Sequence, residues 1–159
     1  MTVSGNVTVN PGGELLVEGG KIGGSIKVTD GWFFIGPSRT VPTVGGSITV
    51  DAPRNFLDCG ATVGSDYTVR NFGAASPPPA PFPGCGAVIT EYVGGNLSFV
   101  NNAGGILWFA TAVNGNFTAT GNGPSNFRQL SINGSATCSN TPPATFTNST
   151  VAGTNSCPG

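Results

Sequence analysis

The chain has 159 residues, of which 8% are charged, and its formal net charge at pH 7 is −1; it contains 26 Gly, 13 Pro and no His. This composition excludes the basic surface that binding to nucleic acid or to an anionic membrane requires. No apolar run approaches the ~20 residues of a membrane-spanning helix.

A seven-residue pattern recurs eight times along the chain. It reads apolar-x-Gly-polar-apolar-Thr-apolar, as in residues 44–50, and its repeats begin at Val3, Ile22, Val44, Val63, Val93, Val113, Ile132 and Val151. Successive repeats start 19, 22, 19, 30, 20, 19 and 19 residues apart. A fixed period near 19 residues with two longer intervals is typical of a solenoid, in which each repeat forms one rung and is buried only by its neighbours.

Each repeat predicts one short strand, and a second apolar segment predicts another. These segments are residues 15–17, 32–35, 56–57, 88–89 and 106–109, then Phe127 with Leu130, and Phe146. Such a repeat is too short for a strand-helix-strand unit of about 30 residues. We therefore expect an all-β, single-domain parallel β-solenoid over residues 1–159, with about eight rungs and a right-handed winding.

The two longer intervals predict insertions in turns. Three extra residues fall near residues 36–39, and a Pro-rich loop falls at about residues 73–84. We expect the Pro-rich loop to form a stiff polyproline II arm. It is either a protected loop or a docking ligand for an aromatic-lined groove.

Alternate residues of each repeat form columns along the solenoid. The first, fifth and seventh residues are mostly Val, Ile and other apolar types, and a period of two places all three on one face. We therefore expect these columns to line the interior. The third residue is Gly in seven of the eight repeats, which predicts a bend or a close approach of the backbone.

Residues 3–9, Val-Ser-Gly-Asn-Val-Thr-Val, and residues 93–99, Val-Gly-Gly-Asn-Leu-Ser-Phe, resemble the repeats of secreted bacterial β-solenoid proteins. This resemblance covers nearly the whole chain, and it implies a fold rather than an activity. Bactofilins, which are cytoplasmic β-helical polymers, are similar more loosely. Their rungs carry more charge and lack this cysteine pattern, so they serve as an analogy for end-to-end polymerisation only.

The four cysteines are placed so that the repeat can pair them. Cys138 and Cys157 each lie six residues after the first residue of their repeat, so we expect them to stack. A rung spacing of ~4.8 Å suits a disulfide, which would clamp the C-terminal rung. Cys59 and Cys85 would then tie down the base of the Pro-rich loop. The alternative is two pairs of buried thiols. Disulfides and a nearly uncharged surface point to a secreted or cell-surface location.

A column of small hydroxyl side chains is the first candidate binding face. It comprises Thr8, Thr49, Thr68, Ser98, Thr118 and Thr137, interrupted by Lys27. A second rank runs beside it: Asn6, Ser25, Ser47, Asp66, Asn96, Asn116, Ser135 and Thr154. These residues are either ordinary strand and turn residues or a surface for polysaccharide. The ordered threonines also resemble those of ice-binding solenoids.

Two tryptophans, Trp32 and Trp108, are the second candidate. Either one is a platform for stacking a sugar ring if it points outward, or both pack in the wall or the core beside neighbouring phenylalanines.

The sequence offers little for catalysis. Without His it lacks the commonest general base and transition-metal ligand, and we expect no cofactor. The seven acidic residues are scattered. Asp51 and Arg70 share one position of the repeat, so we expect an exposed ion pair; a cation site formed by Asp51 with Asp58 or Asp66 is the alternative.

These patterns favour an extracellular, non-catalytic structural or adhesive protein that self-associates end to end, as in a surface fibre. The N-terminal rung has no capping device, so we expect it to be the associating end. Polar Asn155 and the predicted Cys138–Cys157 disulfide mark a partial stop at the other end. A module that binds ice or polysaccharide is the alternative, and a β-helical carbohydrate-active enzyme is the third hypothesis.

Overall fold

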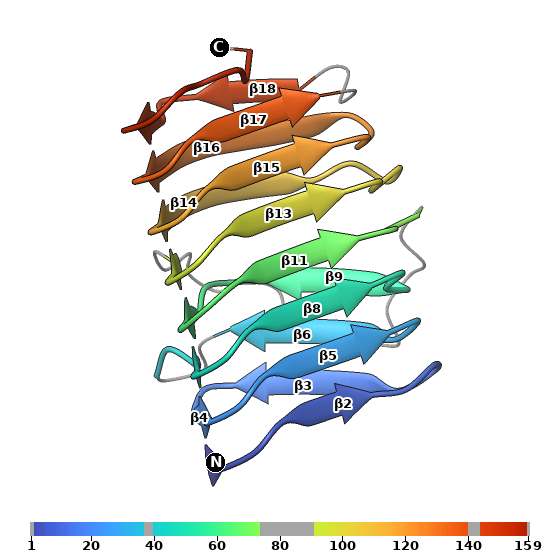
Figure 1. Ribbon diagram of the computed structural model, residues 1–159. Coiled ribbons are helices and arrows are strands. Elements are labelled where there is room, and N and C mark those ends of the chain that lie inside the picture. The colour runs from blue at the N-terminus through green and yellow to red at the C-terminus, as the bar shows by residue number, and fades with distance from the viewer. Residues whose placement is uncertain (1, 37–39, 74–90, 140–143, 159) are drawn as a thin grey trace.

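The structure is a computed structural model, and it describes residues 2–36, 40–73, 91–139 and 144–158. In these residues every regular element is a β-strand. The strands of successive rungs stack along one axis and form parallel sheets (Figure 1). The predicted parallel β-solenoid is therefore confirmed. None of the described segments is a helix that could cross a membrane. The predicted Pro-rich loop, after Gly73, and Cys85 lie outside the described residues.

Three sheets surround the core. Sheet A has nine strands: β1 (Thr2–Val3), β4 (Lys21–Ile22), β7 (Thr43–Val44), β10 (Thr62–Val63), β12 (Glu91–Val93), β14 (Leu107–Val113), β16 (Ser125–Ile132), β18 (Ala144–Thr147) and β19 (Thr150–Val151). Sheet B has seven: β2 (Val7–Val9), β5 (Ile26–Thr29), β8 (Ile48–Asp51), β11 (Tyr67–Arg70), β13 (Leu97–Val100), β15 (Phe117–Thr120) and β17 (Ala136–Ser139). Sheet C has three: β3 (Glu14–Glu18), β6 (Trp32–Gly36) and β9 (Asn55–Asp58).

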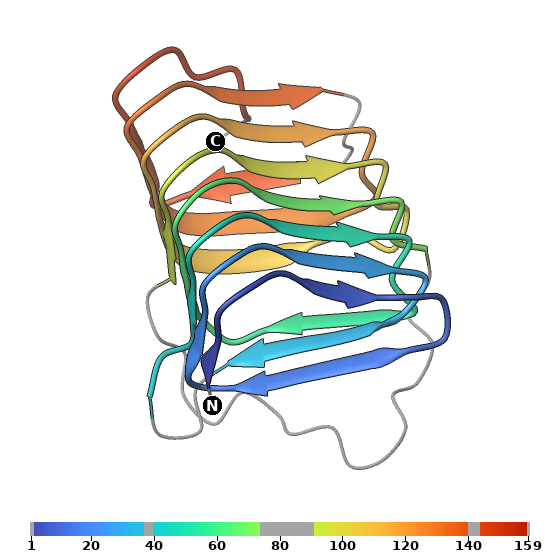
Figure 2. The same cartoon turned by 60° about the horizontal axis from the view of Figure 1, so that its bottom comes forward.

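Where the structure describes a whole rung, the chain runs through sheet A, then sheet B, and then the third side of the solenoid. Sheet C forms the third side at the N-terminal end, and β18 with the first halves of β14 and β16 forms it at the C-terminal end. Figure 2 views the solenoid from its N-terminal end. In this view the chain turns clockwise as it runs away from the viewer. This is the expected right-handed winding.

The register places equivalent residues of successive repeats directly over each other. Val44 pairs with Ile22 on one side and with Val63 on the other, and the column continues to Val151. The columns of sheet B are in register in the same way. Val44, Val63, Ile48 and other inner residues are fully buried. Stacked apolar side chains therefore fill the interior, as expected.

The number of complete rungs is about seven rather than eight, because sheet B has only seven strands. The eighth repeat contributes β19 and one isolated bridge, between Asn155 and Ala136. Asn155 is exposed, whereas its counterparts in the fifth-residue column from Ile26 to Ala136 are buried. A polar residue at an inner position gains nothing from burial, so the last strand of sheet B does not form.

A row of aromatic rings fills the core between the third side and sheet B. Phe56 stacks on Phe33 with 6.0 Å between centroids and on Trp108 with 5.9 Å. Phe99 contacts Trp108 edge-on at 4.9 Å, and further rings continue the row to Phe146. Such contacts add about 0.5–1.5 kcal/mol each to the burial of the rings.

Candidate functional site

The predicted column of hydroxyl residues lies on the outer face of sheet B. Thr8, Lys27, Thr49, Thr68, Ser98, Thr118 and Thr137 follow one another in register across seven parallel strands. Their side chains alternate with those of the buried columns, so they face outward. They are half-buried from Thr49 to Thr118 and exposed at Thr8, Lys27 and Thr137. The fold thus brings these candidate residues together.

The second rank of polar side chains holds successive rungs together. The Oδ1 atom of Asn96 accepts a hydrogen bond from the backbone N–H of Asn116 at 2.9 Å, and Oδ1 of Asn116 accepts one from the N–H of Ser135 at 2.9 Å. Equivalent bonds join Asn6 to Ser25, Ser25 to Ser47, Asp66 to Asn96, and Ser135 to Thr154. A Cβ atom on Gly115 would lie 2.7 Å from Oδ1 of Asn96, so glycine makes room for this ladder. The face therefore offers one free column, not two ranks.

The predicted ion pair is present, but the alternative cation site is not. Arg70 Nη2 lies 2.8 Å from Asp51 Oδ2, and Asn71 Nδ2 donates to Asp51 Oδ1 at 2.8 Å. Asp66 accepts from the next rung, and Asp58 points into the solenoid. The three carboxylates thus serve different partners. Among the described residues no three His, Cys, Asp or Glu side chains are grouped to hold a metal ion.

The disulfide between Cys138 and Cys157 is confirmed, with 4.7 Å between the two Cα atoms. Cys59 is also disulfide-bonded and is buried; its predicted partner, Cys85, lies outside the described residues. Disulfides persist mainly in oxidising compartments, so the bond points weakly to an extracellular environment.

The two tryptophans differ in their surroundings. Trp108 is only 4% exposed and contacts Phe56, Tyr67 and Phe99 inside the solenoid. Its prediction as a sugar platform is wrong, because the outward direction from β14 belongs to its neighbours Leu107 and Phe109. Trp32 is half-buried and alternates with the buried Phe33, which places it on the outer face of sheet C.

A pair of carboxyl groups that was not predicted from the sequence points into the solenoid; Glu91 is buried and Asp58 is half-buried. Asp58 comes from sheet C, Tyr67 from sheet B and Glu91 from sheet A, so three sides converge on one point. Tyr67 Oη donates to Asp58 Oδ2 at 2.6 Å, and the N–H of Gly60 donates to Oδ1 at 2.7 Å. Glu91 is 3% exposed and lies beside Asp58 and Thr111, and its buried Oε1 atom has no hydrogen-bond partner among the described residues.

The environment of this pair keeps a proton on it. Burial raises the pKa of Asp58 from 3.8 to about 6, against the opposing effect of its hydrogen bonds. Burial, reinforced by the charge of Asp58, raises the pKa of Glu91 well above 4.5. These effects favour the protonated form of Glu91, which can donate to the Asp58 carboxylate. Two carboxyl groups can share a low-dielectric site in this way without a cation.

The alternation of inward and outward side chains along each strand indicates that both carboxyl groups face the interior. Asp58 is aligned with Ile35 in the register of sheet C, and Glu91 precedes the inner residue Val93 by two. Both positions therefore face inward, where an acidic residue needs a partner.

Two buried asparagines form a second internal network that was not predicted. Asn102 Nδ2 donates to Val69 O at 3.0 Å and to Asn122 Oδ1 at 2.8 Å, and Asn102 Oδ1 accepts from the N–H of Phe72 at 3.0 Å. Asn122 Nδ2 donates to Phe99 O at 2.9 Å. Each asparagine lies nine residues after the start of its repeat, so this equal spacing could have predicted that the two side chains stack.

The buried pair has little access to a substrate. Asp58 borders a hollow of about 120 Å³ whose walls include Phe56, Phe72 and Trp108. Both carboxylate oxygens of Asp58 already accept hydrogen bonds, and Glu91 is enclosed. The arrangement can hold and release a proton inside the fold.

A comparison of this chain with family models, curated proteins and solved structures finds no match. The resemblance to secreted bacterial β-solenoid proteins and to bactofilins therefore stays a prediction.

Proposed function

We propose that this chain is an extracellular, non-catalytic structural or adhesive β-solenoid that self-associates through its N-terminal end. The observation that carries the proposal is the difference between the two ends of the rod. At the N-terminal end, among the described residues, β1, β2 and β3 each pair with one neighbour only. The inner residues Val3, Val7 and Leu15 are only partly buried there. An open strand edge beside incompletely covered apolar side chains favours pairing with another chain.

The C-terminal end is better closed. Ala136 N–H in β17 donates to Thr154 O at 2.8 Å, and Phe146 N–H in β18 donates to Pro158 O at 3.1 Å. The disulfide from Cys138 to Cys157 fixes this covering segment. Two open N-terminal ends can meet around a two-fold axis, which produces a closed pair. A fibre would need a further contact surface.

The surface and the core agree with a structural role. With 8% charged residues, the rods repel one another weakly. The Asp58–Glu91 pair is engaged within the fold, which supports a non-catalytic role, and the disulfide supports a location outside the cytoplasm.

The test is sedimentation equilibrium of the oxidised chain over a wide range of concentrations, with a variant at the open edge. The N–H of Val7 donates toward β5, to Ser25 O at 2.8 Å. Because N–H groups alternate along a strand, that of Thr8 points to the open end. Thr8→Pro removes this donor at a position that an edge strand tolerates.

We expect the wild-type chain and Thr8→Val, which keeps the amide, to form the same dimer, and Thr8→Pro to remain monomeric with an unchanged circular dichroism spectrum. A wild-type chain that is monomeric at every concentration would contradict the proposal. So would a dimer that Thr8→Pro leaves intact, because the interface would then lie elsewhere.

A further inference from the structure

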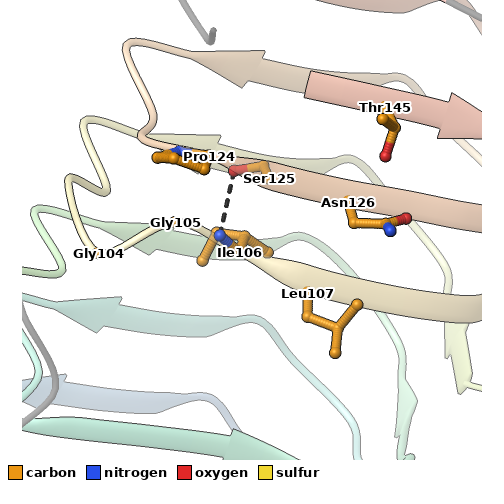
Figure 3. A pocket seen from close by; sticks show the side chains of 8 residues that line it. All are labelled: Gly104, Gly105, Ile106, Leu107, Pro124, Ser125, Asn126 and Thr145. Atoms are coloured by element: carbon orange, nitrogen blue, oxygen red, sulfur yellow. Dashed lines mark hydrogen bonds between the residues drawn. The ribbon is translucent and has the colours of Figure 1, made fainter. Parts of the chain in front are cut away.

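A groove of about 520 Å³ lies on the third side of the solenoid, over the first residues of β14, β16 and β18 (Figure 3). Leu107 forms part of its floor and is 62% exposed, the highest value among the large apolar side chains of the described residues. Ser125 stiffens one wall, since its Oγ accepts from the N–H of Ile106 at 3.1 Å and donates to Gly123 O at 2.8 Å. Asn126 and Thr145 add an amide and a hydroxyl.

A second row of outward side chains lies next to the groove, two residues further along each strand. Phe109 pairs with Arg128 and Arg128 with Thr147, in register with the row formed by Leu107, Asn126 and Thr145. Two residues of a strand span about 7 Å. The guanidinium of Arg128 lies 5.5 Å from the centroid of the Phe109 ring. This cation–π contact orients an otherwise flexible side chain beside the groove.

The charge of Arg128 stands out in this half of the molecule. Residues 92–159 contain no acidic residue, and Arg128 is their only charged side chain. The other five cationic residues and all seven acids lie in residues 1–91. Arg128 is exposed, and residues 92–159 contain no acidic side chain that could neutralise it. A single oriented cation on a neutral surface complements a ligand that carries isolated negative groups.

The amide of Asn126 can adapt to such a ligand. Its Oδ1 atom is buried and has no hydrogen-bond partner among the described residues. Exchanging the positions of Oδ1 and Nδ2 by rotation therefore breaks no hydrogen bond of that oxygen, so the side chain can present either a donor or an acceptor to a hydroxyl group.

We propose that this groove, with Arg128, binds a glycan that carries carboxylate groups, such as a uronate oligosaccharide. Leu107 and Phe109 offer apolar surface to the faces of sugar rings, Asn126 and Thr145 bond to hydroxyls, and Arg128 pairs with a carboxylate. A nucleic acid would require several cations here rather than one. A peptide that binds by strand addition needs a free strand edge, whereas β16 is paired on both sides.

The test is calorimetric titration of the full, oxidised chain with a short oligogalacturonate and with its methyl ester, combined with amide chemical-shift mapping. We expect the acid to bind with shifts in β14, β16 and β18, and the ester to bind more weakly. Loss of a charge-assisted hydrogen bond should weaken binding of the acid about tenfold in Arg128→Gln. Arg54→Gln, a control whose arginine is paired with Asp30, should bind like the wild type.

Absence of binding, equal affinity for acid and ester, or an equal loss in Arg54→Gln would overturn the assignment. Shifts confined to sheet B would move the site to the Thr49 column. Binding of a poly-glutamate peptide with the same dependence on Arg128 would overturn the choice of a glycan. The site does not rest on self-association: Thr8→Pro should bind the acid as the wild type does, so the two proposals fail separately.

Discussion

Replacing Glu91 by glutamine should change how the stability of this protein depends on pH. In the wild-type fold Glu91 is enclosed beside Asp58, and burial raises its pKa, which favours the protonated form. Glutamine has nearly the same shape, and its amide can donate to the same carboxylate. The substitution therefore keeps the contact and removes the titration.

The sign of the effect follows from proton counting. A group whose pKa is raised in the folded state stabilises the fold at low pH, and this contribution declines as the pH rises toward the folded-state pKa. For each pH unit over which folded Glu91 keeps a proton that the unfolded chain has lost, the wild type should lose about 1.4 kcal/mol relative to Glu91→Gln. Asp58, with its pKa raised from 3.8 to about 6, adds a decline of about 3 kcal/mol between these values, which both proteins share.

The assay is urea unfolding at a series of pH values from about 5 to 9, and the fluorescence of the buried Trp108 monitors unfolding. This pH window begins just above the pKa of an unfolded glutamate. The free energy of unfolding of the wild type should fall above pH 6, while that of Glu91→Gln should level off. Glu14→Gln, at an exposed position of β3, is the control and should follow the wild-type profile. Parallel profiles for the wild type and Glu91→Gln would show that Glu91 is not the buried proton carrier.

Two further predictions concern the devices that hold the rungs together. Replacing Cys138 and Cys157 by serine opens a link between residues 19 apart, which should cost about 3 kcal/mol and speed amide exchange in residues 144–158; an unchanged melting temperature would count against the clamp. Asn102→Ala leaves the N–H of Phe72 without its acceptor and should destabilise the fold by about 2–3 kcal/mol in chemical denaturation. The exposed Asn133→Ala should change stability by under about 0.5 kcal/mol, and equal losses in both variants would contradict the importance of the buried network.

The stacking of the rungs could be predicted from the repeat alone. Because equivalent residues recur at a nearly fixed spacing, Val44 had to lie over Ile22 and under Val63, and Cys138 had to lie beside Cys157. Only one such alignment buries every apolar column at once. The Asp51–Arg70 contact follows from the same alignment.

Other features could not be predicted in this way. The repeat left open whether Trp108 points inward, because its segment is apolar on both faces and gives no alternation to decide between them. The repeat also predicted a complete eighth rung, although Asn155 forms only one isolated bridge there.

The sequence by itself determined what lies above and below each residue, because a periodic pattern specifies contacts along the axis of the solenoid. Only the tertiary structure decided what meets across its interior. Asp58, Tyr67 and Glu91 belong to three different sheets and meet inside the solenoid. Such contacts depend on how sharply the chain bends between one side and the next. Those bends are set by the packing of the whole rung, so no local spacing in the sequence encodes them.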